Sequence, residues 1–349
     1  MKTLYPICED GLWGYINYGG SKAIVNRFLF ARPFRDGLAQ VVLNHDKNIH
    51  GAAAFINTDG EVKIGPGPPK IGYERYGIWS EHFEHGALPE WGYRDFSSGR
   101  ALFRDWSMHR GVGYIDDFGR LVAMGFNDGS DFVDGRAIVN IRKGRRNVPT
   151  FIDKDGNVLG DVEADWCGYL SEGRAVYSKD VNGRQLLGYV NTRGHIEIEA
   201  QYRGASAYSS GLARVVTDSG TGFIDVEGHY VVSPELREAT EFSAGVALVV
   251  EDGRTYLIDQ RGGFVCGVNL DASDIWTAEC SEGMFLVGGV VDGDERQGFV
   301  RADGVLICPF QCDLANPFDN GLALVSRNGR AQYLNTHGEV VWETDAWKI

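Results

Sequence analysis

The sequence predicts an all-β protein: an array of about nine three-stranded repeats of 34–38 residues, forming a propeller-like ring or a curved β-solenoid. Three observations predict this fold class. One turn phrase recurs nine times, a second phrase precedes it in eight copies, and the chain of 349 residues contains 47 glycines. That glycine content is about twice the usual share and indicates many tight turns.

The first phrase is an aromatic or aliphatic residue, an aliphatic residue, Asp or Asn, two variable residues, and Gly. All nine copies keep the Gly and eight keep the Asp or Asn. Asp or Asn in the first turn position can accept a hydrogen bond from the backbone N–H two residues on, and Gly in the fourth supplies a positive φ. The flanking residues favour strands, so each copy predicts a β-hairpin with a bulge. The copies begin at Tyr15, Phe55, Tyr114, Phe151, Tyr189, Phe223, Leu257, Phe299 and Tyr333.

The second phrase, Phe-x-x-Gly-x-Ala, leads into an apolar strand. Its glycines lie at 37, 99, 135, 173, 211, 245, 283 and 321, and six of the seven intervals are 34 to 38 residues. The first interval is longer, which indicates an insertion at 61–95. Units therefore begin near residues 1, 34, 96, 132, 170, 208, 242, 280 and 318 of a single array over 1–349. One unit cannot bury its own apolar face, so neighbouring units are expected to stack.

Two stretches carry a resemblance to a known family. Trp13-Gly14-Tyr15-Ile16-Asn17 and Phe242-Ser243-Ala244-Gly245-Val246-Ala247 resemble the unit of the WG-repeat (KWG) proteins of bacteria, and the resemblance extends over nearly the whole chain. Most copies depart from it by keeping the Gly without the Trp, as in Thr221-Gly222. The resemblance implies a β-repeat scaffold used for binding and brings no catalytic residues.

Charge and composition narrow the classes of partner. The formal net charge is −14, which argues against nucleic acid and fits a basic protein partner. No apolar run approaches the roughly 18 residues needed to span a bilayer, and no stretch resembles a signal peptide. We therefore expect a cytoplasmic protein without membrane contact.

No cofactor, metal site or enzymatic activity is predicted. Asp153-Lys154-Asp155-Gly156 could open a calcium loop, but it occupies the common turn position, and Ala164 stands where such a loop needs Glu. The six cysteines lack a CxxC pair and are expected to be reduced and mostly buried; Cys308 and Cys312 are interpreted as core thiols. No Ser/His/Asp or Cys/His constellation is visible.

Two regions are candidate binding sites. The loop between the first two strands of a unit is expected to vary, from about four residues around Asp252 to ten or more at 42–53, 140–149 and 288–297, and to lie on one face of the array. The last of these loops holds Asp292, Asp294 and Glu295. The insertion holds Tyr73, Tyr76, Trp79, Glu81, Phe83, Glu84, Trp91 and Tyr93. Tyr and Trp outside a repeat core are typical interface anchors; alternatively, they pack the insertion onto the array.

The leading hypothesis is a non-enzymatic protein-binding module, most concretely an immunity-type inhibitor that binds and occludes a basic toxin. A carbohydrate-binding or carbohydrate-active repeat protein is the alternative, and it predicts exposed aromatic side chains near paired carboxylates. A structural scaffold is the third hypothesis.

Overall fold

The computed structural model describes residues 2–45, 48–65, 93–105, 111–270 and 273–345. In these residues the regular structure consists of β-strands joined into eight small antiparallel sheets. The all-β prediction is confirmed, and four-stranded antiparallel sheets of this kind are the blades of β-propeller folds. No helix able to cross a membrane occurs in the described residues.

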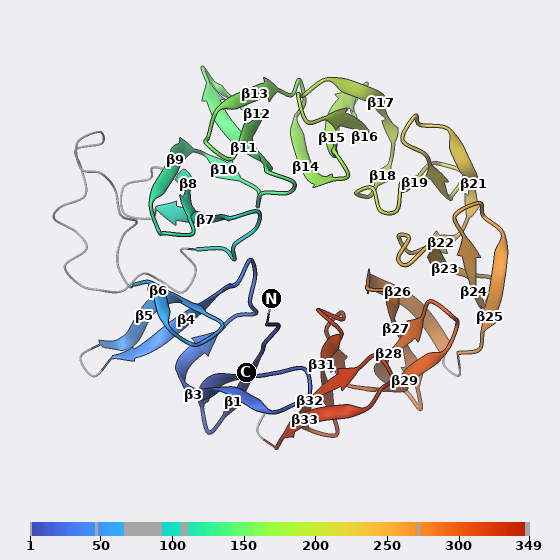
Figure 1. Cartoon of the computed structure of the whole chain (residues 1–349). Helices are drawn as coiled ribbons and strands as arrows, with labels where there is room; N and C mark the ends of the chain where they lie inside the picture. Colours follow the sequence, from blue (N-terminus) through green and yellow to red (C-terminus); the bar gives the residue numbers. More distant parts are fainter. Residues whose placement is uncertain (1, 46–47, 66–92, 106–110, 271–272, 346–349) are drawn as a thin grey trace. The chain divides into compact units, whose positions relative to one another are not determined.

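The strands of every sheet pair in chain order, so each sheet is a meander of hairpins (Figure 1). The first sheet is β1 (Tyr5–Glu9), β2 (Leu12–Ile16), β3 (Lys22–Ala31), β4 (Leu38–His45), β5 (Asn48–Asn57) and β6 (Val62–Ile64). The second is β7 (Arg100–Asp105), β8 (Gly111–Asp116) and β9 (Leu121–Phe126). The third is β10 (Asp128–Gly129), β11 (Arg136–Lys143), β12 (Arg146–Asp153) and β13 (Val158–Asp161). The fourth is β14 (Trp166–Ser171), β15 (Arg174–Val181), β16 (Arg184–Asn191) and β17 (Ile196–Tyr202).

The last four sheets each contain four strands. They are β18 (Gly204–Ala205), β19 (Ala213–Val216), β20 (Thr221–Ile224) and β21 (Tyr230–Leu236); then β22 (Glu238–Ala239), β23 (Val246–Glu251), β24 (Arg254–Asp259) and β25 (Phe264–Val268). Next come β26 (Ser273–Ser281), β27 (Met284–Val291), β28 (Asp294–Arg301) and β29 (Leu306–Cys312), followed by β30 (Leu314–Ala315), β31 (Leu322–Arg327), β32 (Arg330–Asn335) and β33 (Val340–Thr344).

These sheets belong to two compact units. Unit 1 is Met1–Gly173 with Val190–His195, and unit 2 is Arg174–Tyr189 with Ile196–Ile349. The first three sheets lie in unit 1 and the last four in unit 2, and the division falls within the fourth sheet.

The nine copies of the turn phrase form eight sheets, one fewer than the predicted number of repeats. β3 pairs with β2 through Ile24 and Phe28 and with β4 through Phe28 to Ala31, which joins the first two copies into one six-stranded sheet. In later copies the stretch that corresponds to β3 does not form one continuous strand. Its second part, before the next Phe-x-x-Gly phrase, becomes a short additional strand such as β18 or β22. The unit therefore has a fourth strand that the sequence did not predict.

The predicted hairpin turns are confirmed in all nine copies. In the fourth copy the Asp153 carboxylate accepts hydrogen bonds from the backbone N–H groups of Asp155 and Asn157, both at 2.9 Å. The Gly156 N–H donates to the Asp153 carbonyl at 3.0 Å, and the pairing shifts register beside the turn, as a bulge requires. The nine turn glycines have φ between +75° and +87°. Asp153 therefore serves the turn, as its position predicted.

The Phe-x-x-Gly phrase is a two-residue turn whose aromatic ring packs against the preceding copy. Asp36 and Gly37 both have positive φ (51° and 80°), the geometry of a type I′ turn. The ring centroids of Phe223 in β20 and Phe242 in the next phrase lie 4.7 Å apart, in an edge-to-face contact. Equivalent ring pairs at 4.8–5.0 Å are Tyr15–Phe34, Phe55–Phe96, Tyr114–Phe132, Tyr189–Tyr208 and Phe299–Phe318. These pairs confirm that neighbouring copies share one core.

The Trp-Gly phrase is the pair of residues directly before each turn phrase, as in Trp13-Gly14, and several copies keep only its Gly. This Gly marks a position where the next strand of the sheet bulges. A Cβ on Gly222 would lie 2.7 Å from the Val232 carbonyl oxygen and 2.8 Å from the Pro234 backbone. Opposite Gly222, β21 contains two extra residues between the Phe223–Val232 and Thr221–Leu236 pairs. Thr150 occupies the same position in the fourth copy, where the pairing stays regular. Gly thus allows the bulged strand to approach closely.

Candidate binding surfaces

The hairpins between the first and second long strands differ in strand length, and their turns are short: two residues join β11 to β12 and β27 to β28, and four residues join β19 to β20. β27 and β28 pair over eight residues up to a two-residue turn, as do β11 and β12, whereas β19 and β20 pair over four. At the β27–β28 tip, Asp292 and Gly293 both have positive φ, and the twist of such a turn matches that of its strands. The long variable loops expected at 42–53, 140–149 and 288–297 are therefore wrong, because β4 and β5 also pair up to His45 and Asn48.

The three predicted carboxylates Asp292, Asp294 and Glu295 lie together and exposed at the β27–β28 tip. Arg296 lies 3.1 Å from Asp294 and also pairs with Asp313. This arginine offsets part of the negative charge, so the tip is less acidic than its sequence alone indicates.

Of the eight candidate residues in the insertion, the structure places Tyr93 alone; Tyr73, Tyr76, Trp79, Glu81, Phe83, Glu84 and Trp91 lie outside the described residues. Tyr93 is 6% exposed. Its ring lies 5.7 Å from Phe55, edge to face, and 5.9 Å from Phe103. Tyr93 therefore packs in the core between the first and second sheets, as the packing alternative expected.

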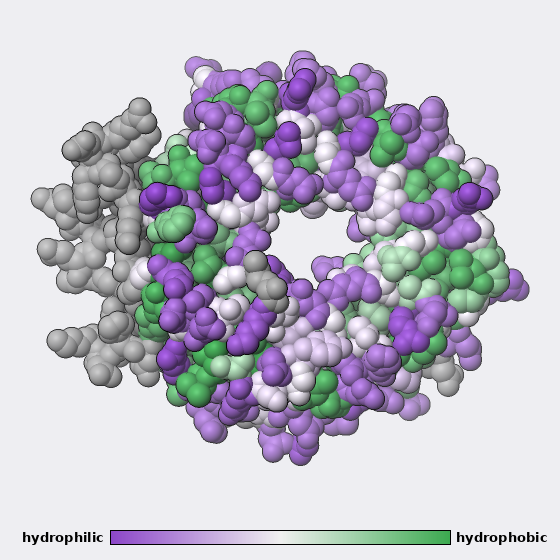
Figure 2. Space-filling view, viewed as in Figure 1, coloured by the Kyte–Doolittle hydropathy of each residue, from purple (hydrophilic) through white to green (hydrophobic). Residues whose placement is uncertain are grey.

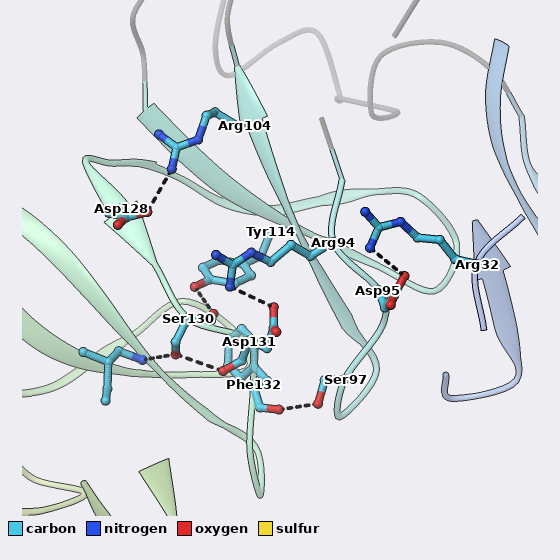
Figure 3. A network of polar contacts seen from close by, with 11 residues as sticks. Arg32, Arg94, Asp95, Ser97, Arg104, Tyr114, Asp128, Ser130, Asp131 and Phe132 are labelled. Atoms are coloured by element: carbon cyan, nitrogen blue, oxygen red, sulfur yellow. Dashed lines mark hydrogen bonds and ion pairs between the residues drawn. The ribbon is translucent and has the colours of Figure 1, made fainter. Parts of the chain in front are cut away.

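Charged side chains beside the Phe-x-x-Gly phrases of unit 1 pair from one copy to the next (Figure 3). Arg32 lies 3.7 Å from Asp95, and Arg94 lies 3.6 Å from Asp131. In both pairs the Arg stands two residues before the Phe of one copy, and the Asp stands one residue before the Phe of the next. The Tyr114 hydroxyl donates to the Ser130 carbonyl at 2.7 Å beside them. Each of these charges therefore has an oppositely charged neighbour within the protein.

The equivalent positions of unit 2 line a polar pocket of about 490 Å³, here called the acidic pocket. Its lining is Arg214, Glu238, Ala239, Thr240, Glu241, Thr277, Glu279 and Cys280, from β19, β22, β26 and the turn after β22. The Thr277 hydroxyl lies 2.9 Å from a Glu238 carboxylate oxygen and donates to it. Three carboxylates and one guanidinium give the lining a formal charge of −2.

The acidic pocket lacks the arginines that neutralise the same positions in unit 1. Glu241 and Glu279 stand one residue before the Phe position of their copies, as Asp95 and Asp131 do. The residues that would face them from the preceding copies are Ser206 and Thr240. Within the described part of the chain, none of the three pocket glutamates forms an ion pair with Arg214, whose Nε is buried without a hydrogen-bond partner.

The chemistry of the acidic pocket suits binding of a cation. Burial raises the pKa of the Cys280 thiol to about 11, and the nearby Glu241 carboxylate adds to the effect. The thiol therefore stays protonated at neutral pH, and it donates a hydrogen bond to the Glu241 carbonyl at 3.4 Å. Without a thiolate nucleophile, the pocket offers carboxylate oxygens and hydroxyls to a ligand.

A second, more apolar pocket of about 840 Å³ lies beside the β23–β24 hairpin. Its apolar lining includes Tyr256, Phe264 and Leu270, and its polar edge is the Glu251–Arg254 turn. Phe264 is 70% exposed, and Figure 2 shows hydrophobic residues gathered over the β24–β25 side of this sheet.

Among the residues that the structure describes, no group of three His, Cys, Asp or Glu side chains is arranged to hold a metal ion. The acidic pocket was not predicted from the sequence, because its residues come from three copies. A comparison of the two positions gives a signal: the residue before the Phe position is acidic at Asp95, Asp131, Glu241 and Glu279, but the opposing position holds Arg32 and Arg94 in unit 1 and Ser206 and Thr240 in unit 2.

Solved structures similar to this chain establish the fold type alone. A crystal structure of a eukaryotic initiation factor matches 87% of this chain and 84% of its own, with 11% sequence identity and a TM-score of 0.56. The Porphyromonas gingivalis dipeptidyl peptidase 4 matches 90% of this chain, with 11% identity and a TM-score of 0.51, and this chain spans 59% of the peptidase. No curated protein matches the chain.

The family model of the WG-containing repeat matches four regions, residues 13–45, 188–219, 222–254 and 298–330. Each region begins at or beside a Trp-Gly-type glycine and ends in or just after a long-strand hairpin. These four regions of the chain are therefore similar to the WG-containing repeat.

Proposed function

We propose that this chain is a non-enzymatic binding module for a basic protein partner, and that a Lys or Arg side chain of the partner enters the acidic pocket. The observation that carries the proposal is the comparison between the units. Where unit 1 places Arg32 and Arg94 against carboxylates, unit 2 leaves Glu241 and Glu279 facing a pocket. An incoming guanidinium would restore the same pairing.

The net charge of the whole chain supports binding of a basic partner. A net charge of −14 attracts a basic partner at long range and speeds its encounter. A pocket of about 490 Å³ is in the range that accepts a long side chain with accompanying water.

The test compares two variants with the same change in charge. The pocket variant carries Glu238→Gln, Glu241→Gln and Glu279→Gln, and the matched control carries Asp292→Asn, Asp294→Asn and Glu295→Gln at the β27–β28 tip. With an oligoarginine peptide as probe, the pocket variant is expected to bind about 10- to 100-fold more weakly than the native chain, from one or two lost charge-assisted hydrogen bonds. Equal loss in both variants would show that only overall charge matters.

In the most concrete version, the partner is a toxin whose active site the chain covers. Co-expression with candidate basic toxins is expected to restore growth with the native chain and to fail with the pocket variant. If no candidate is neutralised and no basic protein binds at micromolar concentration, the inhibitor role is refuted.

One observation favours carbohydrate binding as a second candidate function. Trp166 and Tyr169 in β14 are 40% and 64% exposed, with ring centroids 5.1 Å apart. Tyr169 has a φ of +54°, which is rare for a bulky residue and is found at binding sites. Oligosaccharide binding that disappears in Trp166→Ala would support this function, and a blank glycan array would exclude it.

A further inference from the structure

Two cysteine sulfurs of β29 lie unusually close together. The Sγ atoms of Cys308 and Cys312 are 3.0 Å apart, although both cysteines are free thiols. In a regular strand, residues four apart are separated by about 13 Å. The two side chains therefore meet only because the backbone between them is not a regular strand.

A wide bulge brings the two cysteines together. The pairing of β28 with β29 passes from Phe299–Ile307 to Gln297–Cys312, so five residues of β29 span the length of two residues of β28. Cys308 and Phe310 have φ of +49° and +45°, the left-handed region that non-glycine residues rarely adopt. The strained backbone thus holds the thiols in contact in the reduced protein.

A neighbouring guanidinium favours the thiolate form of one cysteine. The Arg327 side chain, at the end of β31, places Nη1 3.9 Å from the Cys308 sulfur and 3.3 Å from the Gln311 side-chain oxygen. The hydrogen bond from Cys312, together with Arg327, lowers the pKa of Cys308 to about 7. Donating that hydrogen bond raises the pKa of Cys312. By contrast, burial raises the pKa of Cys167 to about 12.

We infer that Cys308 and Cys312 are a redox-active pair that closes to a disulfide when the protein meets a hydroperoxide. The Cys308 thiolate attacks one peroxide oxygen, the O–O bond breaks, and the outer oxygen leaves as water or an alcohol after taking a proton. Cys308 is then a sulfenic acid. The Cys312 sulfur attacks it, an S–S bond forms, and the sulfenic oxygen leaves as water. Two electrons pass from the two thiols to the peroxide.

The burial of the pair is compatible with this chemistry. Cys308 is 8% exposed and Cys312 is not exposed, so a small peroxide reaches Cys308 first. The resolving thiol then lies in contact, which favours disulfide closure over further oxidation of the sulfenic acid.

The test uses the native full-length chain, hydrogen peroxide and alkylation under denaturing conditions. Trypsin releases residues 302–327 as one peptide, which contains Cys308 and Cys312 and no other cysteine. Without peroxide this peptide should take two alkyl groups. After peroxide it should take none and lack two hydrogen atoms, and dithiothreitol should restore both alkylation sites. The other four cysteines should remain alkylated throughout.

Three variants distinguish the proposed reaction of this pair from general thiol reactivity. Arg327→Gln should slow oxidation at pH 7 by about three- to tenfold, while Arg327→Lys should keep most of the rate, because a cation favours the thiolate. Cys312→Ser should leave Cys308 to accumulate as sulfinic acid. The inference is overturned if the native peptide keeps both alkylation sites under peroxide, gains oxygen without forming the disulfide, or cross-links to another cysteine.

Discussion

The glycine of the Trp-Gly phrase provides a direct test of how the bulged strands are accommodated. In Gly222→Ala the new Cβ would lie 2.7 Å from the Val232 carbonyl oxygen and 2.8 Å from Pro234 backbone atoms. Backbone atoms cannot rotate away as the end of a side chain can, so β21 must shift. Overpacking of this kind costs about 1–3 kcal/mol, and backbone obstacles place Gly222→Ala towards the upper value.

Gly267→Ala is the matched control. Gly267 lies in β25 of the same unit, has no left-handed φ, and has no heavy atom within 4 Å of an added Cβ. Both substitutions remove the same freedom from the unfolded chain, a gain of about 0.4–1 kcal/mol that cancels when the two variants are compared. The difference in unfolding free energy between them is then the steric cost alone.

The measurement is urea unfolding followed by tryptophan fluorescence, with the midpoint compared at equal slope. Gly222→Ala should unfold at clearly lower urea than Gly267→Ala. Equal midpoints would mean that the bulge tolerates a side chain, and the assigned role of this glycine would be refuted.

The remaining predictions address the ring pairs, the turns and the acidic pocket. Phe242→Ala should cost about 3–5 kcal/mol, because Phe242 is buried against Phe223, whereas Phe264→Ala should change stability by less than about 0.5 kcal/mol; thermal unfolding distinguishes them. Hydrogen bonds from the Asn157 side chain and from backbone N–H groups lower the pKa of Asp153. The stability that the ionised Asp153 carboxylate contributes is therefore present above the unfolded-state pKa of about 3.9, and it is lost as the pH falls through the lower folded-state pKa. Asp153→Asn should therefore keep the turn at pH 7 and reduce acid sensitivity, while Asp153→Ala should lose about 1 kcal/mol at pH 7 in denaturant titrations. Oligoarginine binding to the native chain should weaken steadily as salt is raised, and binding that is insensitive to salt in calorimetry would exclude the ionic contacts.

The turns were predictable from the sequence because their chemistry is local. Asp153 and Gly156 lie within one turn, and no distant residue is needed to select its geometry. The same local rule applies at the hairpin tips: Asp292-Gly293 is a strong signal for a two-residue turn, and it outweighs the composition that predicts a long loop at 288–297.

The count of sheets was not predictable from the phrases. It depends on whether the chain breaks between the third strand of one copy and the next Phe-x-x-Gly, and β3 does not break. The acidic pocket was hidden for a similar reason. Arg214, Glu238 and Glu279 lie in three successive sheets, and only the stacking of these sheets brings them together.

The ring pairs have a consequence for how the chain acquires its structure. Phe223 and Phe242 are 19 residues apart, so a contact between neighbouring sheets is made by residues close in sequence. Contacts of short sequence separation form early and cheaply, and they allow order to spread from one sheet to the next. Leu170 and Cys280 stand where the other copies have an aromatic ring, and the division between the two compact units falls just after Leu170-Ser171-Glu172-Gly173. Because neither side chain supplies an aromatic ring, we expect hydrogen exchange to report different stabilities for the residues before and after each of these two sites.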